Sequence, residues 1–250
     1  MNPNFVKTSS SSHSSGIHLE KSQIFKFVSK KNNLLELEED DEKVFLLSGV
    51  TDKEKSYFTE RKWNITFYFF LKYWKEIELL RGRVTEDVTD NITHLITTSP
   101  KGSLKLFCSL AIGGIWILQP NFIYDSASEG NWVSEISREW SEDYLPDGSF
   151  EMKFVKAIKR RREENFKAFK DWKIGFEIKN EISVLVEVGG GNLIDLSVED
   201  EIETMTHLYV ENKIKSQLAS QIENWRKLNP NFKIVKKTEI MTHLTKNLKL

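Results

Sequence analysis

The pattern of apolar and polar positions changes near residue 43 and predicts an alternating α/β chain from there on. An unbroken apolar run at residues 44–47 is closed by Ser48 and Gly49, as expected for a strand buried on both faces of a parallel sheet. Apolar residues then recur at helical spacing from Phe67 to Ile77, with Gly82 as the expected helix stop. The rest of the predicted β-α-β-β-α-β-α unit consists of strands at 83–84, 93–97 and 116–118 and helices at 104–112 and 121–127.

A second, weaker copy of this unit is predicted after a helical segment at residues 150–169. Its expected strands lie at 172–178, 193–194, 206–210 and 233–235, and its expected helices at 182–188, 214–225 and 238–244. Both copies contain a strand that begins Thr-His-Leu, at residues 93 and 206. Repeats of this length indicate two tandem domains and not a solenoid.

The amino-terminal residues carry no periodic apolar pattern. Serine dominates the first 22 residues, and an acidic block occupies residues 36–42. Such a segment buries too little apolar surface to offset the entropy of ordering. We therefore predict a disordered or irregular tail at 1–42, followed by a first domain at 43–140, a helical linker at 141–170 and a second domain at 171–250.

Composition excludes several classes of protein. The 36 Lys and Arg residues balance 37 Asp and Glu residues, so net charge gives no general attraction to nucleic acid. One cysteine, Cys108, permits neither an internal disulfide nor a cysteine-based zinc site, and a reducing compartment is expected. The chain shows neither a signal-peptide pattern nor the roughly 18 consecutive apolar residues of a membrane span, so we expect a soluble intracellular protein.

The predicted sheet order places a candidate anion site in the first domain. If the chain passes outward to its second strand and returns to its third, strands one and three flank the point where strand order reverses, and ligands bind there. Ser48 and Gly49 end strand one, while Ser103 and Lys105 lie at the start of the helix after strand three. Two hydroxyls, a backbone N–H and an ammonium at a helix start form a small phosphate socket.

Several sequence segments resemble the BRCT domain. They are FLLSG at 45–49, THLI at 93–96, SLK at 103–105, GGIWIL at 113–118 with Trp116, and NFIYDS at 121–126. Further segments at 166–178, 187–194, 206–210 and 233–240 resemble a linker and a second BRCT domain, and are most similar to the carboxyl-terminal BRCT pair of the topoisomerase II-binding checkpoint scaffold. The resemblance implies an α/β fold of two tandem BRCT repeats, each a four-stranded parallel sheet flanked by helices, joined by a helical linker.

The resemblance also implies a function. Tandem pairs of this kind are non-enzymatic, cofactor-free nuclear scaffolds that bind phosphoserine or phosphothreonine peptides in the DNA-damage response or the replication checkpoint. The family's phosphate-binding positions fall on Ser48, Gly49, Ser103 and Lys105, and its inter-repeat peptide groove falls on Phe107.

The sequence departs from the family pattern at four places. One extra residue before Trp116 leaves Lys101 as an alternative to Lys105, and Gly102 stands where the family often has arginine. A long aromatic insertion spans residues 57–73. The second repeat has Lys179-Asn180 in place of Ser-Gly, so we expect no second phosphate there.

Two other functions are compatible with the sequence. The linker run Lys159, Arg160, Arg161 and Arg162 is interpreted as a solvated face, a nuclear address or a DNA contact, and a DNA-binding module would use it together with Lys213 and Lys215. The other alternative is a constitutive protein-interaction pair with a vestigial phosphate pocket.

The histidines and the glycine run receive structural interpretations. We expect His94 and His207 to form internal hydrogen bonds with the threonines that precede them, and we do not expect metal binding or catalysis there. Cys108 is expected to be buried, and Gly189-Gly190-Gly191 is expected to stop a helix.

Overall fold

The computed structural model describes residues 42–49, 65–89, 91–146, 149, 151–211 and 216–246, with the side chains of the first helix described from residue 72 onward. The predicted tail before residue 42, the aromatic insertion before residue 65, and Lys213 and Lys215 lie outside the described residues. Within the described residues, no helix is long and apolar enough to cross a membrane.

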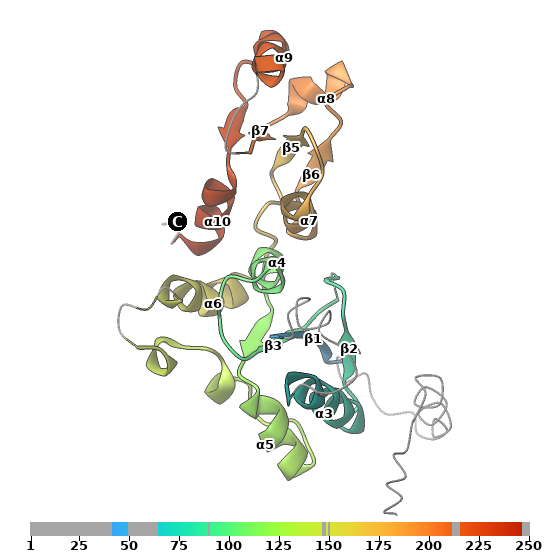
Figure 1. Ribbon diagram of the computed structural model, residues 1–250, viewed down its shortest axis with the longest axis vertical. Helices are drawn as coiled ribbons and strands as arrows, with labels where there is room; N and C mark the ends of the chain where they lie inside the picture. Colours follow the sequence, from blue (N-terminus) through green and yellow to red (C-terminus); the bar gives the residue numbers. More distant parts are fainter. Residues whose placement is uncertain are drawn as a thin grey trace, which may run out of the picture. The chain divides into compact units, whose positions relative to one another are not determined.

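The first sheet has four parallel strands in the order β2-β1-β3-β4 (Figure 1). They are β1 (Val44–Ser48), β2 (Arg83–Thr85), β3 (His94–Thr97) and β4 (Trp116–Leu118). The chain therefore passes outward to β2 and returns to β3, which is the path on which the candidate anion site was located from the sequence. At the carboxyl edge Ser48 pairs with Thr97, which brings the ends of β1 and β3 side by side.

Helices cover both faces of this sheet. They are α3 (Ile65–Leu79), α4 (Leu104–Ile112), α5 (Asn121–Glu129) and α6 (Met152–Glu164), with short 3-10 turns at Ile136–Arg138 and Glu142–Tyr144 before α6. Because successive strand side chains point to opposite faces, Phe45 packs with α3 and α5, whereas Leu46 packs with α4 and α6. This two-sided burial explains the unbroken apolar run of β1.

The end of α3 corrects one sequence prediction. The helix ends at Leu79, and the residue with left-handed backbone is Arg81, at φ 63°, instead of Gly82. Gly82 is needed for another reason: a Cβ there would lie 2.9 Å from side-chain atoms of Ile77 and Phe45. Glycine at this position permits close packing on the core.

The second sheet repeats the topology, with strand order β6-β5-β7-β8 (Figure 1). Its elements are β5 (Lys173–Phe176), α7 (Glu181–Val188), β6 (Asn192–Ile194), α8 (Glu199–Thr204), β7 (His207–Tyr209), α9 (Ser216–Leu228), β8 (Lys233–Val235) and α10 (Lys237–Thr245). Helix α8 was not predicted from the sequence. Its segment EDEIET contains one apolar residue, Ile202, and so shows no helical apolar pattern. The fold class of two four-stranded parallel sheets flanked by helices is confirmed.

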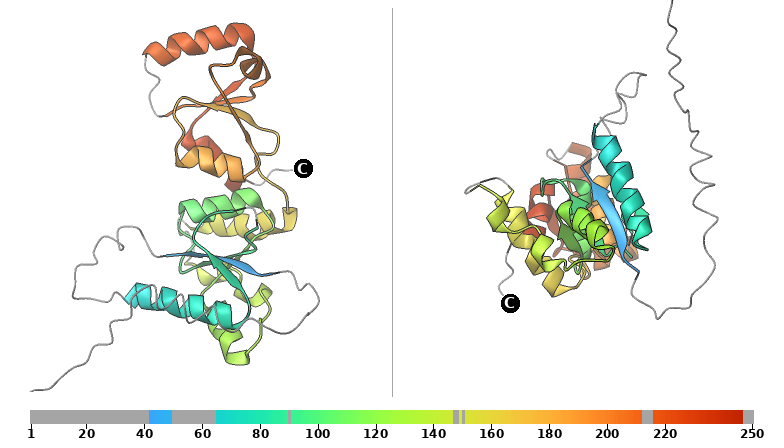
Figure 2. Two further views of the ribbon diagram at one scale, coloured as in Figure 1. Left: turned by 90° about the vertical axis from the view of Figure 1, so that its right-hand side faces the viewer. Right: turned by 90° about the horizontal axis from the view of Figure 1, so that it is seen from below.

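Helix α4 has two buried faces. Leu106 and Leu110 pack on the first sheet, whereas Cys108 and Ala111 join the core of the second repeat with α7 and α10. Leu104, the first residue of the helix, is 37% exposed. Figure 2 shows α4 and α6 beside the helices of the second repeat. The two repeats therefore share one apolar cluster, to which α4 of the first repeat contributes Cys108 and Ala111.

Cys108 is completely buried, as predicted. Desolvation raises the pKa of its thiol to about 12, so it stays protonated near neutral pH.

The glycine run after α7 stops the helix, as predicted, and also lets the repeats approach. Gly190 has φ 85°. A Cβ on Gly189 would lie 2.5 Å from the ring of Phe169 and 2.9 Å from the Cβ of Ala111 in α4. Two backbone hydrogen bonds join the same segments: Phe169 N–H donates to the Gly189 carbonyl, and Ala168 N–H donates to the Ala111 carbonyl, each at 2.8 Å.

The linker arginines are structural, which corrects the interpretation of a solvated basic face. Arg161 is 3% exposed and donates to the carbonyls of Leu110 and Phe166 and to Glu164. Arg162 donates to both carboxylate oxygens of Glu139 and lies 4.0 Å above the ring of Trp116.

Arg160 is also engaged within the fold. It pairs with Glu164 and donates to the Leu244 carbonyl of α10 at 2.8 Å. Of the four cations in this run, Lys159 is the solvated one, with 70% of its side chain exposed.

Candidate functional site

The carboxyl edge of β1 and β3 brings the predicted anion-binding residues together. Ser48 ends β1 and Gly49 follows it, while the turn after β3 leads through Pro100 to the first residue of α4. Since β2 lies on the other side of β1, this edge is the point where strand order reverses. Helix α4 begins beside it.

Gly49 has a backbone that other residues rarely adopt. Its φ is 123°, and a Cβ would lie 2.9 Å from the hydroxyl oxygen of Thr98. Glycine thus satisfies both the backbone conformation and the space at this position. The residue is exposed, as a backbone donor to an external ligand must be.

Ser103 is the N-cap of α4. Its Oγ accepts the Leu106 N–H at 3.2 Å and lies 3.4 Å from the Oγ of Ser48. Because the cap bond uses a lone pair of Ser103, its hydroxyl hydrogen stays available for donation to an acceptor. The amino-terminal end of α4 lies beside it, and the helix dipole favours negative charge there.

Lys105 supplies the positive charge. Its Nζ donates to the carbonyl oxygen of Leu47 at 3.0 Å, which holds the ammonium at the end of β1. Helix α4 begins at Leu104, so the extra residue before Trp116 leaves Lys105 within the first turn. Lys101, the alternative from sequence, is exposed and precedes the helix.

Thr98 is a residue that the sequence reasoning missed. It is exposed and directly follows the strand residue that pairs with Ser48, so its hydroxyl lies beside Gly49. The sequence held a partial signal, because Thr98 directly follows the predicted strand 93–97 as Gly49 follows the first strand, while the register that pairs Ser48 with Thr97 comes from the structure. Three hydroxyls, a backbone amide, an ammonium and a helix start therefore meet at one edge, which suits a tetrahedral oxyanion.

Phe107 lies at the junction of the two repeats. It is partly buried, packs against the cores of both repeats, and meets Phe154 of α6 edge-to-face at 5.5 Å between ring centroids. A Cβ on Gly102 would lie 2.8 Å from the Phe107 ring. Glycine before Ser103 thus accommodates this ring.

The equivalent position of the second repeat is used internally. Asn180 caps α7, with its side chain accepting the Ile182 N–H at 2.9 Å and its backbone N–H donating to Ser183. The side-chain amide oxygen of Asn180 is therefore engaged in the helix cap.

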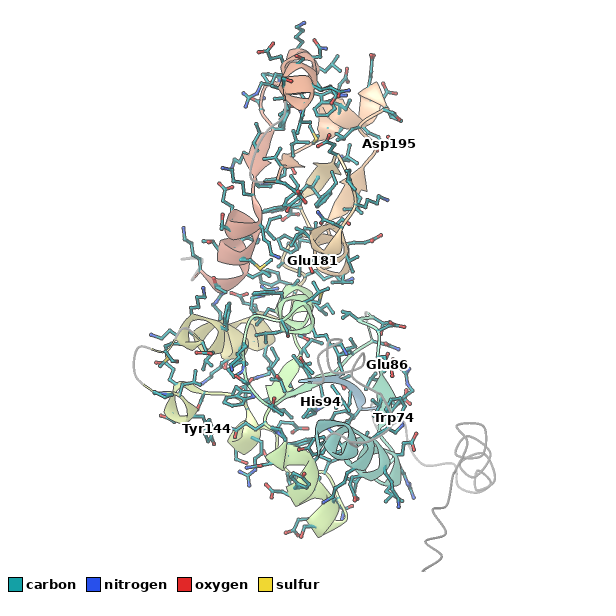
Figure 3. The ribbon with its side chains drawn as sticks, in the orientation of Figure 1. Trp74, Glu86, His94, Tyr144, Glu181 and Asp195 are labelled. Carbon is teal, nitrogen blue, oxygen red and sulfur yellow. The ribbon has the colours of Figure 1, made fainter. Side chains whose placement is uncertain are left out.

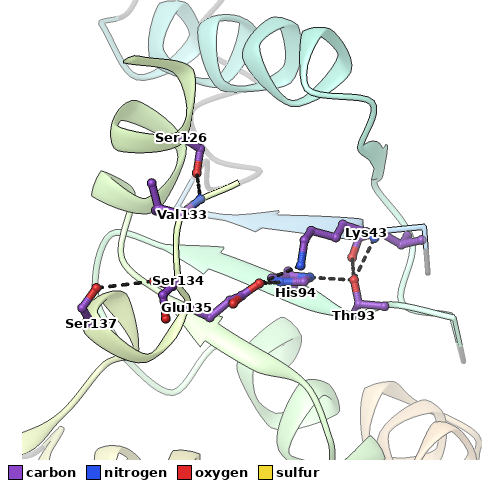
Figure 4. A network of polar contacts seen from close by, with 9 residues as sticks. Lys43, Thr93, His94, Ser126, Val133, Ser134, Glu135 and Ser137 are labelled. Atoms are coloured by element: carbon purple, nitrogen blue, oxygen red, sulfur yellow. Dashed lines mark hydrogen bonds and ion pairs between the residues drawn. The ribbon is translucent and has the colours of Figure 1, made fainter. Parts of the chain in front are cut away.

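The Thr-His pairs form internal hydrogen bonds, as predicted. Figure 3 shows the place of His94 in the first repeat, and Figure 4 shows its contacts with Thr93 and Glu135. The Nδ1 of His94 lies 2.6 Å from Thr93 Oγ1, and its Nε2 faces Glu135, which Lys43 also contacts at 2.7 Å. The hydrogen bond from His94 lowers the pKa of Glu135 to about 2, while burial lowers the pKa of His94 and favours its neutral form.

His207 is arranged in the same way. Its Nδ1 lies 2.8 Å from Thr206 Oγ1, and its ring stacks on Trp172 with 3.7 Å between centroids. Among the described residues, no group of three or more His, Cys, Asp or Glu side chains is arranged to hold a metal ion.

Comparison with known proteins agrees with this architecture. Residues 42–127 match the family model of the BRCA1 C Terminus (BRCT) domain. The crystal structure of the S. pombe Brc1 BRCT5-BRCT6 domains superposes with a TM-score of 0.53 at 15% identity, covering 83% of this chain and 94% of that chain. The fold is that of a tandem BRCT pair. At this identity, the superposition establishes the fold alone.

Curated relatives match a shorter part of the chain. The human SMC5-SMC6 complex localization factor protein 1 is 31% identical over 114 residues, and the mouse protein is 30% identical over 114 residues. The alignments cover 42% of this chain and 11% of each relative, so the chain spans a small part of their length. The similarity predicted to the topoisomerase II-binding scaffold is not confirmed by these matches, which are to other proteins.

Proposed function

We propose that this chain is a non-enzymatic scaffold module that binds phosphoserine or phosphothreonine peptides through its first BRCT repeat. The observation that carries the proposal is the meeting of Ser48, Gly49, Ser103 and Lys105 at one sheet edge. Thr98 joins them as a further hydroxyl donor in this proposal.

Binding would depend on phosphorylation because the site offers donors and positive charge. A phosphate adds about −1.5 to −2 charge and three strong acceptor oxygens, whereas an unmodified hydroxyl offers neither. The hydroxyls of Ser48 and Ser103 and the N–H of Gly49 would hold the phosphate oxygens, and Lys105 would neutralise their charge.

Phe107 is our candidate for contact with the peptide beyond the phosphate. It contacts the cores of both repeats, so a peptide that runs from Ser103 toward the second repeat would pass its exposed part. Because residue 102 is glycine, the arginine that the family often has at this position is missing from the path of the peptide.

The cellular setting follows from the relatives and is part of the proposal. Tandem BRCT pairs act as protein-interaction scaffolds, and the matched mammalian proteins are named for localising the SMC5-SMC6 complex. We therefore assign the module to the nucleus, in the DNA-damage response or the replication checkpoint, with a phosphorylated protein as partner.

The DNA-binding alternative loses its main support. Arg160, Arg161 and Arg162 are engaged with carboxylates and backbone carbonyls inside the fold. A duplex contact through these residues would have to break those bonds. Salt dependence separates the two functions, because binding to many phosphates weakens steeply with ionic strength and binding to one phosphate does so much less.

The deciding experiment compares a phosphoserine and phosphothreonine peptide library with its unphosphorylated counterpart. Wild type is expected to bind only phosphorylated peptides, and the Ser48→Ala, Lys105→Ala double variant is expected to lose that binding. Lys101→Ala, which removes an exposed lysine outside the helix, is the matched control. Equal binding to both libraries by wild type would overturn the proposal and indicate a constitutive pair with a vestigial pocket. Circular dichroism verifies that each variant is folded.

A further inference from the structure

A cavity of about 150 Å³ lies where the linker meets the second repeat. Its walls come from the end of α6, the segment that leads into β5, and α10. The residues that matter for its chemistry are Arg160, Phe166, Lys167, Lys170, Trp172 and His243. None of them belongs to the phosphate site of the first repeat. We propose that this cavity binds a phosphate monoester carried on an apolar stem.

Charge at the cavity favours an anion. Arg160, Arg161, Lys167 and Lys170 line it, and Asp171 is the acidic residue among the described lining residues. Glu164 pairs with both Arg160 and Arg161. When the charge of Glu164 is added to that of Asp171, the four basic side chains still outnumber the two carboxylates. A small cavity with this excess attracts negative ligands more strongly than an open surface does.

Arg160 has hydrogen-bonding capacity left over. Its terminal nitrogens donate to Glu164 and to the Leu244 carbonyl, but its buried Nε has no hydrogen-bond partner among the described residues. Because this Nε is buried, Arg160 contributes positive charge to the cavity and no exposed donor. Lys170 lies at the rim, exposed, with its Nζ 5.1 Å from the centroid of the Phe166 ring.

The remaining walls are aromatic. The rings of Phe166, Trp172 and His243 line the cavity, and the ring of Trp172 is held by stacking on His207. The cavity volume of about 150 Å³ exceeds the roughly 10–15 Å³ that one water requires. A phosphate group would therefore fill only part of the cavity. The first atoms of an apolar stem would occupy the rest and contact the rings.

The test uses phenyl phosphate as the probe and NMR as the readout. The Ser48→Ala, Lys105→Ala background removes the first-repeat site, so failure of the proposed peptide binding and failure of this cavity are distinguishable. Phenyl phosphate is expected to shift the indole N–H of Trp172 and the ring of His243 in a saturable way. Inorganic phosphate is expected to bind more weakly, and benzyl alcohol is expected to produce no saturable shift.

A matched pair of lysine variants tests where the anion binds. Adding Lys167→Gln and Lys170→Gln to this background keeps most of each side chain's aliphatic part and removes both positive charges. The affinity for phenyl phosphate is expected to fall roughly tenfold or more. Lys159→Gln removes a solvated charge from the same linker and is expected to leave affinity unchanged. Absence of saturation, equal affinity in the Lys167→Gln, Lys170→Gln variant, or equal binding of benzyl alcohol would overturn the proposal. Inorganic phosphate binding as tightly as phenyl phosphate would overturn the role of the apolar stem.

Discussion

At the residue scale, single side chains serve the fold and the candidate site together. Ser103 caps α4 through its lone pair and keeps its hydroxyl hydrogen for an acceptor. Lys105 is fixed by the Leu47 carbonyl, so its ammonium is positioned before any ligand arrives. Gly49 combines a φ of 123° with close approach to Thr98. Prepositioned donors lose little conformational entropy on binding, which favours affinity for one small anion.

Removing the ammonium tests the charge requirement. Lys105→Ala is expected to cost about 1.5–3 kcal/mol of phosphopeptide affinity, the range for hydrogen bonds to charged groups. Isothermal titration calorimetry with a peptide selected from the library measures this loss. Lys101→Ala is expected to bind as wild type does, and an equal loss in both variants would contradict a specific role for Lys105.

The Thr98 hydroxyl can be removed with little change of shape. Thr98→Val is expected to weaken phosphopeptide binding about tenfold or more, because one hydrogen bond to a charged acceptor is lost. Thr98→Ser keeps the hydroxyl and is expected to bind nearly as wild type does in the same calorimetric titration. Unchanged affinity in Thr98→Val would remove Thr98 from the site.

At the element scale, α4 and α6 decide how the repeats are joined. Helix α4 packs on its own sheet through Leu106 and Leu110 and on the second repeat through Cys108 and Ala111. Helix α6 adds Arg161, whose guanidinium bonds the carbonyl at the end of α4 and the carbonyl of Phe166. These contacts explain why a run of four basic residues contains only one solvated side chain.

The buried arginine provides a stability test. Arg161→Met keeps the apolar stem, leaves two carbonyls without their donor and removes one of the two arginines that pair with Glu164. The free energy of unfolding is therefore expected to fall by about 3–5 kcal/mol. Lys159→Met, two residues earlier on the same helix, is expected to change it by less than about 0.5 kcal/mol. Urea unfolding followed by circular dichroism measures both values. Equal effects in the two variants would show that Arg161 contributes no more than a solvated cation.

At the scale of the whole molecule, the shared core predicts that protonation inside the second repeat affects global stability. Burial, together with Lys233 and His243, lowers the pKa of His207 to about 4. The unfolded chain, with an ordinary histidine pKa near 6.5, binds more protons between these values. Stability from neutral His207 is therefore complete above about pH 6.5 and is lost as the pH falls toward 4.

The pH dependence is measured by urea unfolding at several pH values. The free energy of unfolding is expected to fall by at most about 3 kcal/mol through His207 between pH 6.5 and 4. The pKa of His94 is also lowered, so its protonation destabilises the fold over the same pH range. The contribution of His207 is therefore taken as the difference in pH dependence between wild type and His207→Gln. NMR titration of His207 with a pKa near 6.5 would contradict this expectation. Glu135, with a pKa of about 2, loses its contribution only below about pH 4.5.

Local patterns of burial and helical spacing were enough to predict the strands and most helices, whereas the sheet order was assumed from the usual handedness of strand connections. The sequence also placed Ser48, Gly49, Ser103 and Lys105 near one another, since parallel strands end at a common edge. Only the tertiary structure showed that Arg161 is buried, that α4 has two buried faces, and that Arg81 has the left-handed backbone where Gly82 was expected. It also placed Thr98 beside Gly49. These features depend on contacts between segments far apart in the chain, which decide whether a charge is solvated and where a side chain must be absent.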